Sequence, residues 1–226
     1  MVATSLALPR STTYHLLSTL AEHGFVAHYP DQRVYGLGLA AYELGSGYTR
    51  QEPLQRLARK PMAELSDNCR QSAHLAVLRG ADVVYVIEER AVGRPRLVTD
   101  VGVRLPAHRT ASGRAMLASL PRQQVSALFP NAAALGDMDG GAVTSVAGLR
   151  RLLVDVRRAG HATESGEVTI GISSVAMAVL DPNDYPIAAV TVTYPHAGDG
   201  EDRVRPGLLH GVAATVSALQ QRLRGL

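Results

Sequence analysis

The hydrophobic pattern near the start of the chain predicts a helix followed by a hairpin. The side chains that would share one helix face are Thr13, Leu16, Leu17 and Leu20. Pro9 suits the first turn of this helix, and Gly24 suits its end, where a left-handed residue is favoured. Short alternating segments at 25–29 and 34–37, joined by a charged turn, predict two antiparallel strands. A helix followed by a two-stranded wing is the second half of a winged helix-turn-helix, which lays one helix into the DNA major groove.

From residue 51 onward the pattern predicts a second domain of mixed helix and sheet. Amphipathic helices are expected at 51–68, 122–129, 145–159 and 204–223. The first of these contains Pro61, so we expect a kink or a split into two helices there. Alternating or β-branched runs predict strands at 72–79, 83–88, 96–101, 172–180 and 187–193. Such a strand-rich middle with helices at both ends is typical of an α/β or α+β sensor domain.

The segments between these elements are expected to be irregular. Residues 104–106 read as a loop, and residues 161–164 lead into a loop that ends at Gly171. Thr110 is a candidate N-cap for the helix that follows it. Gly45, Ser46 and Gly47 loosen the chain between the two parts. We therefore expect a DNA-binding domain with its linker at 1–47 and a sensor domain at 48–226.

Composition narrows the function classes without choosing one. At 226 residues the chain suits one large or two small domains, and its net charge of +3 permits nucleic-acid binding without requiring it. Its single cysteine, Cys69, excludes a disulfide within the chain and a cysteine-cluster metal site. Because no apolar run is long enough to cross a membrane and no signal pattern begins the chain, we expect a soluble, cytoplasmic protein without membrane contact.

Three stretches of sequence resemble one family. LPRSTTYHLLSTLAEHGFV followed by YGLGLAAYELG resembles the DNA-binding domain of the IclR family of bacterial transcription regulators. Residues 58–62 loosely match a family segment with the same proline, and GVRLPAHRTASGRAMLASL at 102–120 is similar to the family's most specific C-terminal segment. The resemblance covers essentially the whole chain. It implies an α+β protein, in which a winged helix-turn-helix DNA-binding domain is joined by a linker helix to a GAF-like α/β effector domain.

Family members also carry a complete first helix and most of a second before the point where this sequence starts. A truncated front or an upstream start is therefore expected. A recognition helix without its supporting helices would leave Leu16, Leu17 and Leu20 poorly covered, so weak DNA binding by this chain is expected even if its full-length parent binds well.

The predicted DNA contacts lie on the polar side of the first helix and in the wing. They are Arg10, Ser11, Thr12, Thr13, His15 and Arg33. Short hydroxyls can donate to phosphates or touch base edges, and an arginine in the wing turn can reach phosphate or the minor groove. Family members usually have arginine at the position of His15, and an imidazole lacks the guanidinium fork that reads guanine. A solvated helix face is the alternative for each of these residues.

The resemblance also implies a pocket for a small-molecule effector in the second domain. The residues that it assigns to this pocket are Leu97, Ala111, Ser112, Glu164, Ile172, Ser174, Thr191 and Thr193. Physically, a helix N-terminus beside Ala111 binds anions, and hydroxyls that alternate on two strands can line one wall. A small organic or aromatic acid is the expected ligand. Ordinary N-capping and β-propensity are the alternative for each hydroxyl alone, and Ser174 replaces a cysteine that many members carry.

Enzyme interpretations find little support. His108, Ser112 and Glu164 could be imagined as a triad, but no G-x-S-x-G turn frames the serine. The histidines lack metal-ligand spacing, and there is no phosphate-binding glycine loop, so neither a metal nor a cofactor is expected. We therefore predict a regulator, not an enzyme, whose partners are operator DNA, a small-molecule effector and further copies of the chain in a homodimer or dimer of dimers. A stand-alone sensor domain with a non-functional DNA reader, and a hydrolase using Ser112, are the competing hypotheses.

Overall fold

The computed structural model describes residues 2–32, 34–44, 53–93, 99–136, 143–196 and 204–224. Internal contacts divide the chain into two units, Met1–Arg56 and Leu57–Leu226. The boundary expected between residues 47 and 48 lies outside the described residues, as do Arg33 and Leu97. Each unit is described by itself below.

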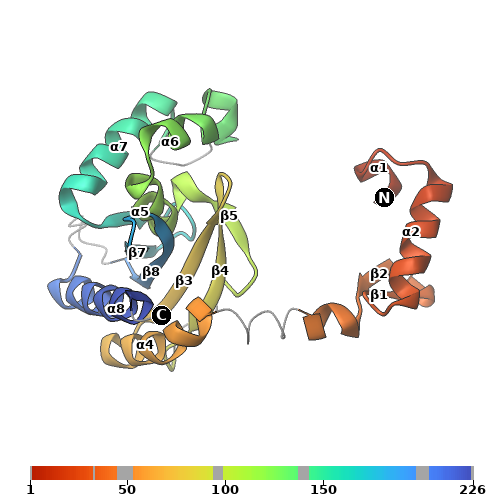
Figure 1. The fold of residues 1–226 in the computed structure, drawn as a ribbon, viewed down its shortest axis with the longest axis horizontal. Helices are drawn as coiled ribbons and strands as arrows, with labels where there is room; N and C mark the ends of the chain where they lie inside the picture. The colour runs from red at the N-terminus through yellow and green to blue at the C-terminus, as the bar shows by residue number, and fades with distance from the viewer. Residues whose placement is uncertain are drawn as a thin grey trace. The chain divides into compact units, whose positions relative to one another are not determined.

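The first unit contains the predicted helix and wing (Figure 1). A short helix α1 (Val2–Ser5) precedes α2 (Arg10–Glu22), and Gly24, just beyond the end of α2, has a φ of +72°. Strands β1 (Val26–Tyr29) and β2 (Val34–Leu37) pair antiparallel around a short 3-10 turn, η1 (Pro30–Gln32). Residues 39–44 are helical. Of the predicted apolar face only Thr13 is buried, while Leu16 and Leu20 are 50% and 41% exposed. The face is therefore largely uncovered within this unit.

The second unit is built on one six-stranded antiparallel sheet. Its strands are β3 (Ser72–Arg79), β4 (Asp82–Glu89), β5 (Arg104–Pro106), β6 (Ala162–Ser165), β7 (Ile172–Leu180) and β8 (Pro186–Pro195). They lie in the order β5-β4-β3-β8-β7-β6, so that the first and last thirds of the unit meet at the β3–β8 pair. This arrangement brings the N-terminal part of β3 beside the C-terminal part of β8.

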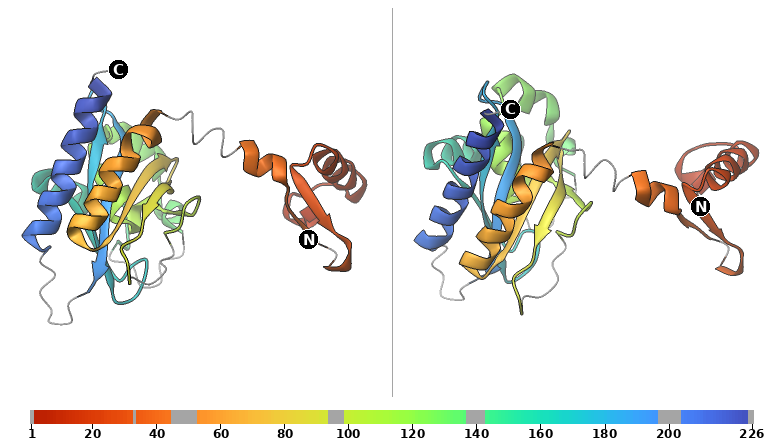
Figure 2. Two further views of the ribbon diagram at one scale, coloured as in Figure 1. Left: turned by 90° about the horizontal axis from the view of Figure 1, so that it is seen from below. Right: turned by 60° about the horizontal axis from the view of Figure 1, so that its bottom comes forward.

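Helices cover both faces of this sheet (Figures 1 and 2). α4 (Pro53–Cys69) and α8 (Pro206–Arg224) lie side by side on one face, where Arg222 Nη1 donates to the carbonyl of Leu57 at 2.9 Å. On the other face, α5 (Ala111–Ser119) lies against the sheet, and α6 (Arg122–Leu128) and α7 (Val146–Ala159) lie farther out. The 3-10 turns η2 (Ala107–Arg109) and η3 (Ala132–Leu135) complete this layer.

Small side chains let α5 approach the sheet closely. Ala76, Ala176 and Ala189 are fully buried in the cluster formed with this helix. At the start of α5, a Cβ on Gly113 would lie 2.2 Å from the carbonyl oxygen of Ala107, so no larger residue fits there without a shift. The result is a helix whose residues from Ala111 to Ala118 are all buried.

The structure differs from the sequence-based expectations in four details. Residues 104–106, expected as a loop, form β5, which pairs with β4 and turns Leu105 toward the core. Residues 162–165, expected to lead into a loop, form β6. The expected strand at 96–101 is absent at 99–101, and its remainder lies outside the described residues. Pro61 does not split its helix, because α4 runs unbroken from Pro53 to Cys69.

Candidate functional site: a hydroxyl-lined pocket and a DNA-reading helix

The candidate pocket begins at the N-terminus of α5. Thr110 caps this helix by accepting a hydrogen bond from the Gly113 amide at 3.0 Å. A helix leaves its first amide groups without partners inside the helix and carries a partial positive charge at that end. The first turn at Ala111 lies beside the polar ends of β7 and β8, which gives this place an affinity for negative charge.

Side chains from four strands and two connecting segments enclose the space beside this turn. The lining residues are Tyr85, Thr99, Thr110, Ala111, Glu164, Val168, Thr169, Ile172, Ser174, Thr191 and Thr193. Only about 10 Å³ is open to the centre of a water molecule, which is room for roughly one water. The pocket is therefore nearly filled by its own side chains, and a larger ligand requires part of the wall to move.

Glu164 is the only carboxylate among these lining residues. It is 4% exposed, and its two oxygens accept hydrogen bonds from Ser174 Oγ at 2.7 Å and from the amide of Glu167 at 3.2 Å. Burial raises the pKa of Glu164, while these two hydrogen bonds oppose the rise. Ser174 Oγ also lies 3.2 Å from Thr193 Oγ1, so the β7 and β8 hydroxyls form one network.

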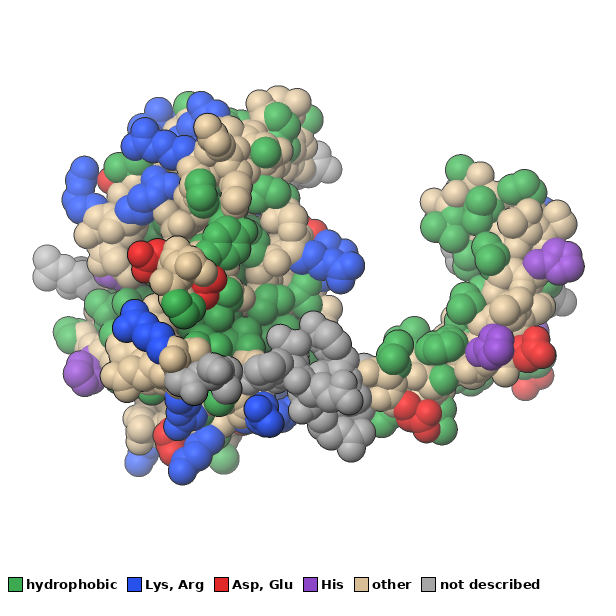
Figure 3. Space-filling view, in the orientation of Figure 1, with side chains coloured by type: hydrophobic (Ala, Val, Ile, Leu, Met, Phe, Trp, Pro, Cys, Tyr) green, Lys and Arg blue, Asp and Glu red, His purple; other side chains and the backbone are tan. Residues whose placement is uncertain are grey.

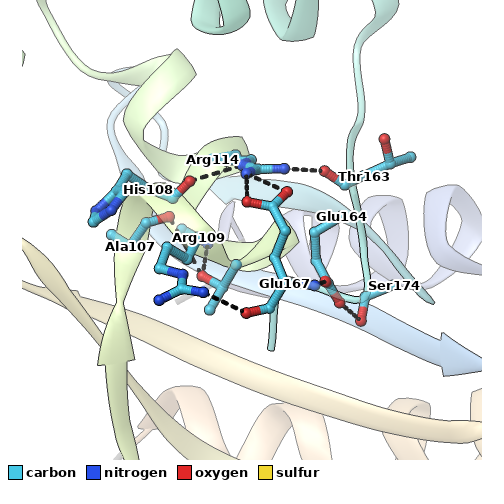
Figure 4. A network of polar contacts seen from close by, with 10 residues as sticks. Ala107, His108, Arg109, Arg114, Thr163, Glu164, Glu167 and Ser174 are labelled. Atoms are coloured by element: carbon cyan, nitrogen blue, oxygen red, sulfur yellow. Dashed lines mark hydrogen bonds and ion pairs between the residues drawn. The ribbon is translucent and has the colours of Figure 1, made fainter. Parts of the chain in front are cut away.

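A buried arginine fixes this wall to α5 (Figure 4). Arg114 is 3% exposed and donates through Nε to the carbonyl of His108 and through Nη1 to that of Thr163, both at 2.8 Å. Its Nη2 lies 2.6 and 2.7 Å from the two carboxylate oxygens of Glu167. Arg109 donates to the carbonyl of the same Glu167 at 3.1 Å. One guanidinium thus holds together the start of α5 and the segment that follows β6.

Beside the pocket, two buried polar atoms have no hydrogen-bond partner among the described residues. They are Nδ1 of His74 and Oγ1 of Thr191, which face each other across β3 and β8. His74 Nε2 lies 2.9 Å from Thr99 Oγ1, and burial lowers the pKa of His74 to about 4. Burial raises the pKa of Tyr85 to about 12. These groups are uncharged at neutral pH and can accept or donate hydrogen bonds to a polar ligand.

The structure gathers most of the residues assigned to the pocket from sequence. Six of them line it: Ala111, Glu164, Ile172, Ser174, Thr191 and Thr193. Ser112 is fully buried next to it, with Oγ 3.4 Å from Thr110 Oγ1 and 3.5 Å from the hydroxyl of Tyr85. Sequence reasoning missed Tyr85 and Thr99 in the lining, and His74 beside it. The alternation in β3 and β4 could have indicated which of their residues share a face, but not that this face meets β8.

The candidate DNA contacts on α2 differ in their exposure. Arg10, Ser11, Thr12 and His15 are exposed. Thr13 is 6% exposed, and its hydroxyl donates to the carbonyl of Pro9 at 3.1 Å. In the wing, the rings of His28 and Tyr35 stack across the two strands with centroids 4.5 Å apart. Arg33 is not among the described residues.

Comparison with known proteins assigns the chain to a protein family. A family model described as the C-terminal domain of the bacterial transcriptional regulator IclR matches residues 46–220, and one described as the IclR helix-turn-helix domain matches residues 1–30. The protein belongs to the IclR family of bacterial transcriptional regulators. The transcriptional repressor IclR of Escherichia coli K12 is 25% identical to it over 205 residues, which cover 90% of this chain and 74% of the repressor. The family consists of transcription regulators and not of enzymes.

Solved structures of this family show the same fold. RHA06195 from Rhodococcus sp. RHA1 superposes with a TM-score of 0.78 at 27% identity, over 99% of this chain and 89% of that one. An IclR homologue from Microbacterium hydrocarbonoxydans, solved in complex with 4-hydroxybenzoate, superposes with a TM-score of 0.79 at 23% identity, over 100% of this chain and 90% of that one. The expected fold, a helix-turn-helix domain with a GAF-like effector domain, is confirmed.

Among the described residues, the hydroxyl of Ser112 bonds to Thr110 and Tyr85 and to no histidine, so the imagined triad with His108 and Glu164 is not assembled. No group of three or more His, Cys, Asp or Glu side chains in the described ranges could hold a metal ion. None of the described helices is long and apolar enough to cross a membrane.

Proposed function

We propose that this IclR-family regulator binds operator DNA through α2 and the wing, and that a small organic acid in the α5 pocket changes its operator affinity. Because one helix reads few base pairs, a homodimer or dimer of dimers would supply the second reader. The observation that carries the proposal is the pocket itself, in which the positive end of α5 faces buried hydroxyls. Thr191 Oγ1, which is buried and has no hydrogen-bond partner in the described part of the chain, supplies a group that a ligand could satisfy.

The charge of Glu164 decides how an acid would bind. A carboxylate ligand beside an ionised Glu164 would be repelled, whereas a protonated Glu164 could donate a hydrogen bond to it. Burial already raises the pKa of Glu164, and a bound anion would raise it further. Acid binding should therefore take up a proton and strengthen as the pH falls. Glu164→Gln should strengthen acid binding at neutral pH and remove its pH dependence.

A screen of small carboxylates and aromatic acids against the whole chain tests the pocket. 4-Hydroxybenzoate, found bound to the Microbacterium homologue, is one acid to include. A ligand that binds there should raise the melting temperature of the protein. Its affinity should fall at least tenfold in Thr191→Val. Thr163→Val is the matched control, because this side chain is exposed on β6 while its neighbour Glu164 points into the pocket. Equal binding by both variants, or no stabilising acid, would count against the pocket.

The link to DNA needs a separate measurement. Fluorescence anisotropy with the DNA upstream of the regulator's own gene should show salt-sensitive binding that the identified acid changes. Arg10→Gln should weaken this binding without altering acid affinity, since α2 belongs to the other unit.

A stand-alone sensor with a non-functional reader remains the second candidate. The exposure of Leu16 and Leu20 on α2 favours it, since an uncovered apolar face leaves a helix poorly supported. Acid binding together with no salt-sensitive DNA binding would select this candidate.

A further inference from the structure

A second concave site lies between α6 and α7, away from the effector pocket. Its lining residues are Arg122, Val125, Ser126, Arg150, Leu153, Val154 and Arg157, and it has a volume of about 400 Å³. None of these residues lines the effector pocket. In Figure 3 the blue Lys and Arg side chains gather over these two helices, at the upper left of the second unit.

Three arginines and no carboxylate are among the residues that line this groove. Among the described residues, none of Arg122, Arg150 and Arg157 forms an ion pair. Arg150 and Arg157 are two helical turns apart, and so share one side of α7. The acidic residue of α7, Asp155, does not line the groove, and lies 3.9 Å from Arg158 instead. Three like charges around one hollow favour a bound anion over an empty site.

Two of these arginines each form one hydrogen bond that restricts the guanidinium. Arg157 donates through Nε to the carbonyl of Ala118, which leaves its two terminal nitrogens with no hydrogen bond among the described residues. Arg150 reaches across from α7 to α6, where Nη2 lies 3.4 Å from Ser126 Oγ. A planar guanidinium held through one nitrogen presents its remaining donors in the geometry that suits a phosphate group. Ser126 adds a hydroxyl that can donate to the same anion.

The groove has an apolar floor as well as a charged rim. Val125 and Leu153 are 5% and 1% exposed, and Val154 at the edge is 41% exposed. A volume of about 400 Å³ is in the range of small-molecule sites, whereas a DNA duplex is too wide to enter a hollow of this size. We propose that this groove binds a small phosphate ester, with the phosphate on Arg122, Arg150 and Arg157 and its organic part on the apolar floor.

Calorimetric titration of the whole chain with phenyl phosphate at about 0.15 M salt tests this site. Phenol and inorganic phosphate are the companion ligands, because each carries half of the proposed recognition. Arg150→Gln/Arg157→Gln should weaken phenyl phosphate binding at least tenfold. Arg151→Gln/Arg158→Gln is the matched control, because it removes the same charge from exposed positions of α7 outside the groove. Arg122→Gln alone should weaken binding several-fold, which gives a second test from the other helix.

Each alternative has its own result. Saturable binding of phenyl phosphate, stronger than that of inorganic phosphate or phenol and lost only in the groove variants, supports the site. Equal weakening in both double variants would show general charge attraction and overturn it. No phosphate ester binding, with weaker DNA binding in Arg150→Gln/Arg157→Gln, would overturn it in favour of a contact with the DNA backbone. Acid binding at α5 is measured separately and should be unchanged in all these variants.

Discussion

Replacing Arg114 with methionine should remove the main tie between α5 and the wall of the effector pocket. The side chain is 3% exposed and its guanidinium bonds to two carbonyl groups and to the carboxylate of Glu167, which is itself 8% exposed. Breaking a buried ion pair by removing one partner costs about 3–5 kcal/mol, because the remaining charge stays in a medium of low dielectric constant. For a protein of this size that corresponds to a fall in melting temperature of roughly 6–20 °C.

Urea denaturation followed by circular dichroism would measure the loss in free energy of unfolding. Arg104→Met is the matched control, because Arg104 forms an ion pair of similar length with Asp82, at 3.1 Å, but the two side chains are 53% and 38% exposed. An exposed pair contributes at most about 1 kcal/mol. The double variant Arg114→Met/Glu167→Met should recover part of the loss, since no buried charge is then left. If Arg114→Met costs no more than Arg104→Met, the network does not hold the wall in the way argued here.

Three further predictions concern α5 and the sheet beneath it, with a control on α8. Burial lowers the pKa of His74 from 6.5 to about 4, so the folded protein resists protonation of this side chain. The free energy of unfolding should therefore fall by up to about 3 kcal/mol as the pH drops from 6.5 toward 4. In His74→Gln, the urea midpoint should depend less on pH in this range. Gly113→Ala should lower the free energy of unfolding by about 1–3 kcal/mol, because the new Cβ would meet the backbone of Ala107. At Gly207 a Cβ would meet nothing within 4 Å, so calorimetry of Gly207→Ala should show a gain of up to about 1 kcal/mol in this free energy. Thr110→Ala should lower the free energy of unfolding by about 1 kcal/mol and speed amide exchange at Gly113, because the cap hydrogen bond is lost. Thr110→Ser keeps the hydroxyl and should retain most of this stability. A pH profile unchanged in His74→Gln, or equal melting temperatures for the two glycine variants, would contradict these arguments.

Local patterns predicted the elements that depend on local interactions. The helix α2, its glycine end and the β1–β2 hairpin all follow from spacing within about thirty residues. The same holds for α7, whose predicted range of 145–159 differs from the observed one only in the N-cap residue, Ser145. β5 and β6 were not predicted, because segments of three and four residues carry little periodicity of their own and neither is joined to its partner, β4 or β7, by a short turn with a clear sequence signal.

In the pocket too, some features could be predicted from the sequence and others depend on contacts between distant residues. The resemblance assigned the strand hydroxyls, but the role of Arg114 depends on contacts to residues 49 and 53 positions away, which no local pattern indicates. A helix that is exposed on one side would point its arginine toward water. In α5 every residue from Ala111 to Ala118 is buried, so the arginine becomes an internal tie. Tyr85 likewise reaches Ser112 across 27 residues of sequence.

The near-filled pocket and the rigid α5 together indicate which wall must move when a ligand enters. Gly113 packs against Ala107 and Arg114 is held by four hydrogen bonds, so α5 has little freedom to withdraw. The segment from Gly166 to Gly171 carries Val168 and Thr169 into the pocket, and both glycines adopt positive φ angles, +70° and +77°, with open space where a Cβ would lie. Within it Ile170 is 94% exposed. Glu167, near the start of this segment, is held by Arg114, so ligand entry should displace only the part that follows Glu167. Once an acid is bound, slower amide exchange should therefore be confined to residues 168–171.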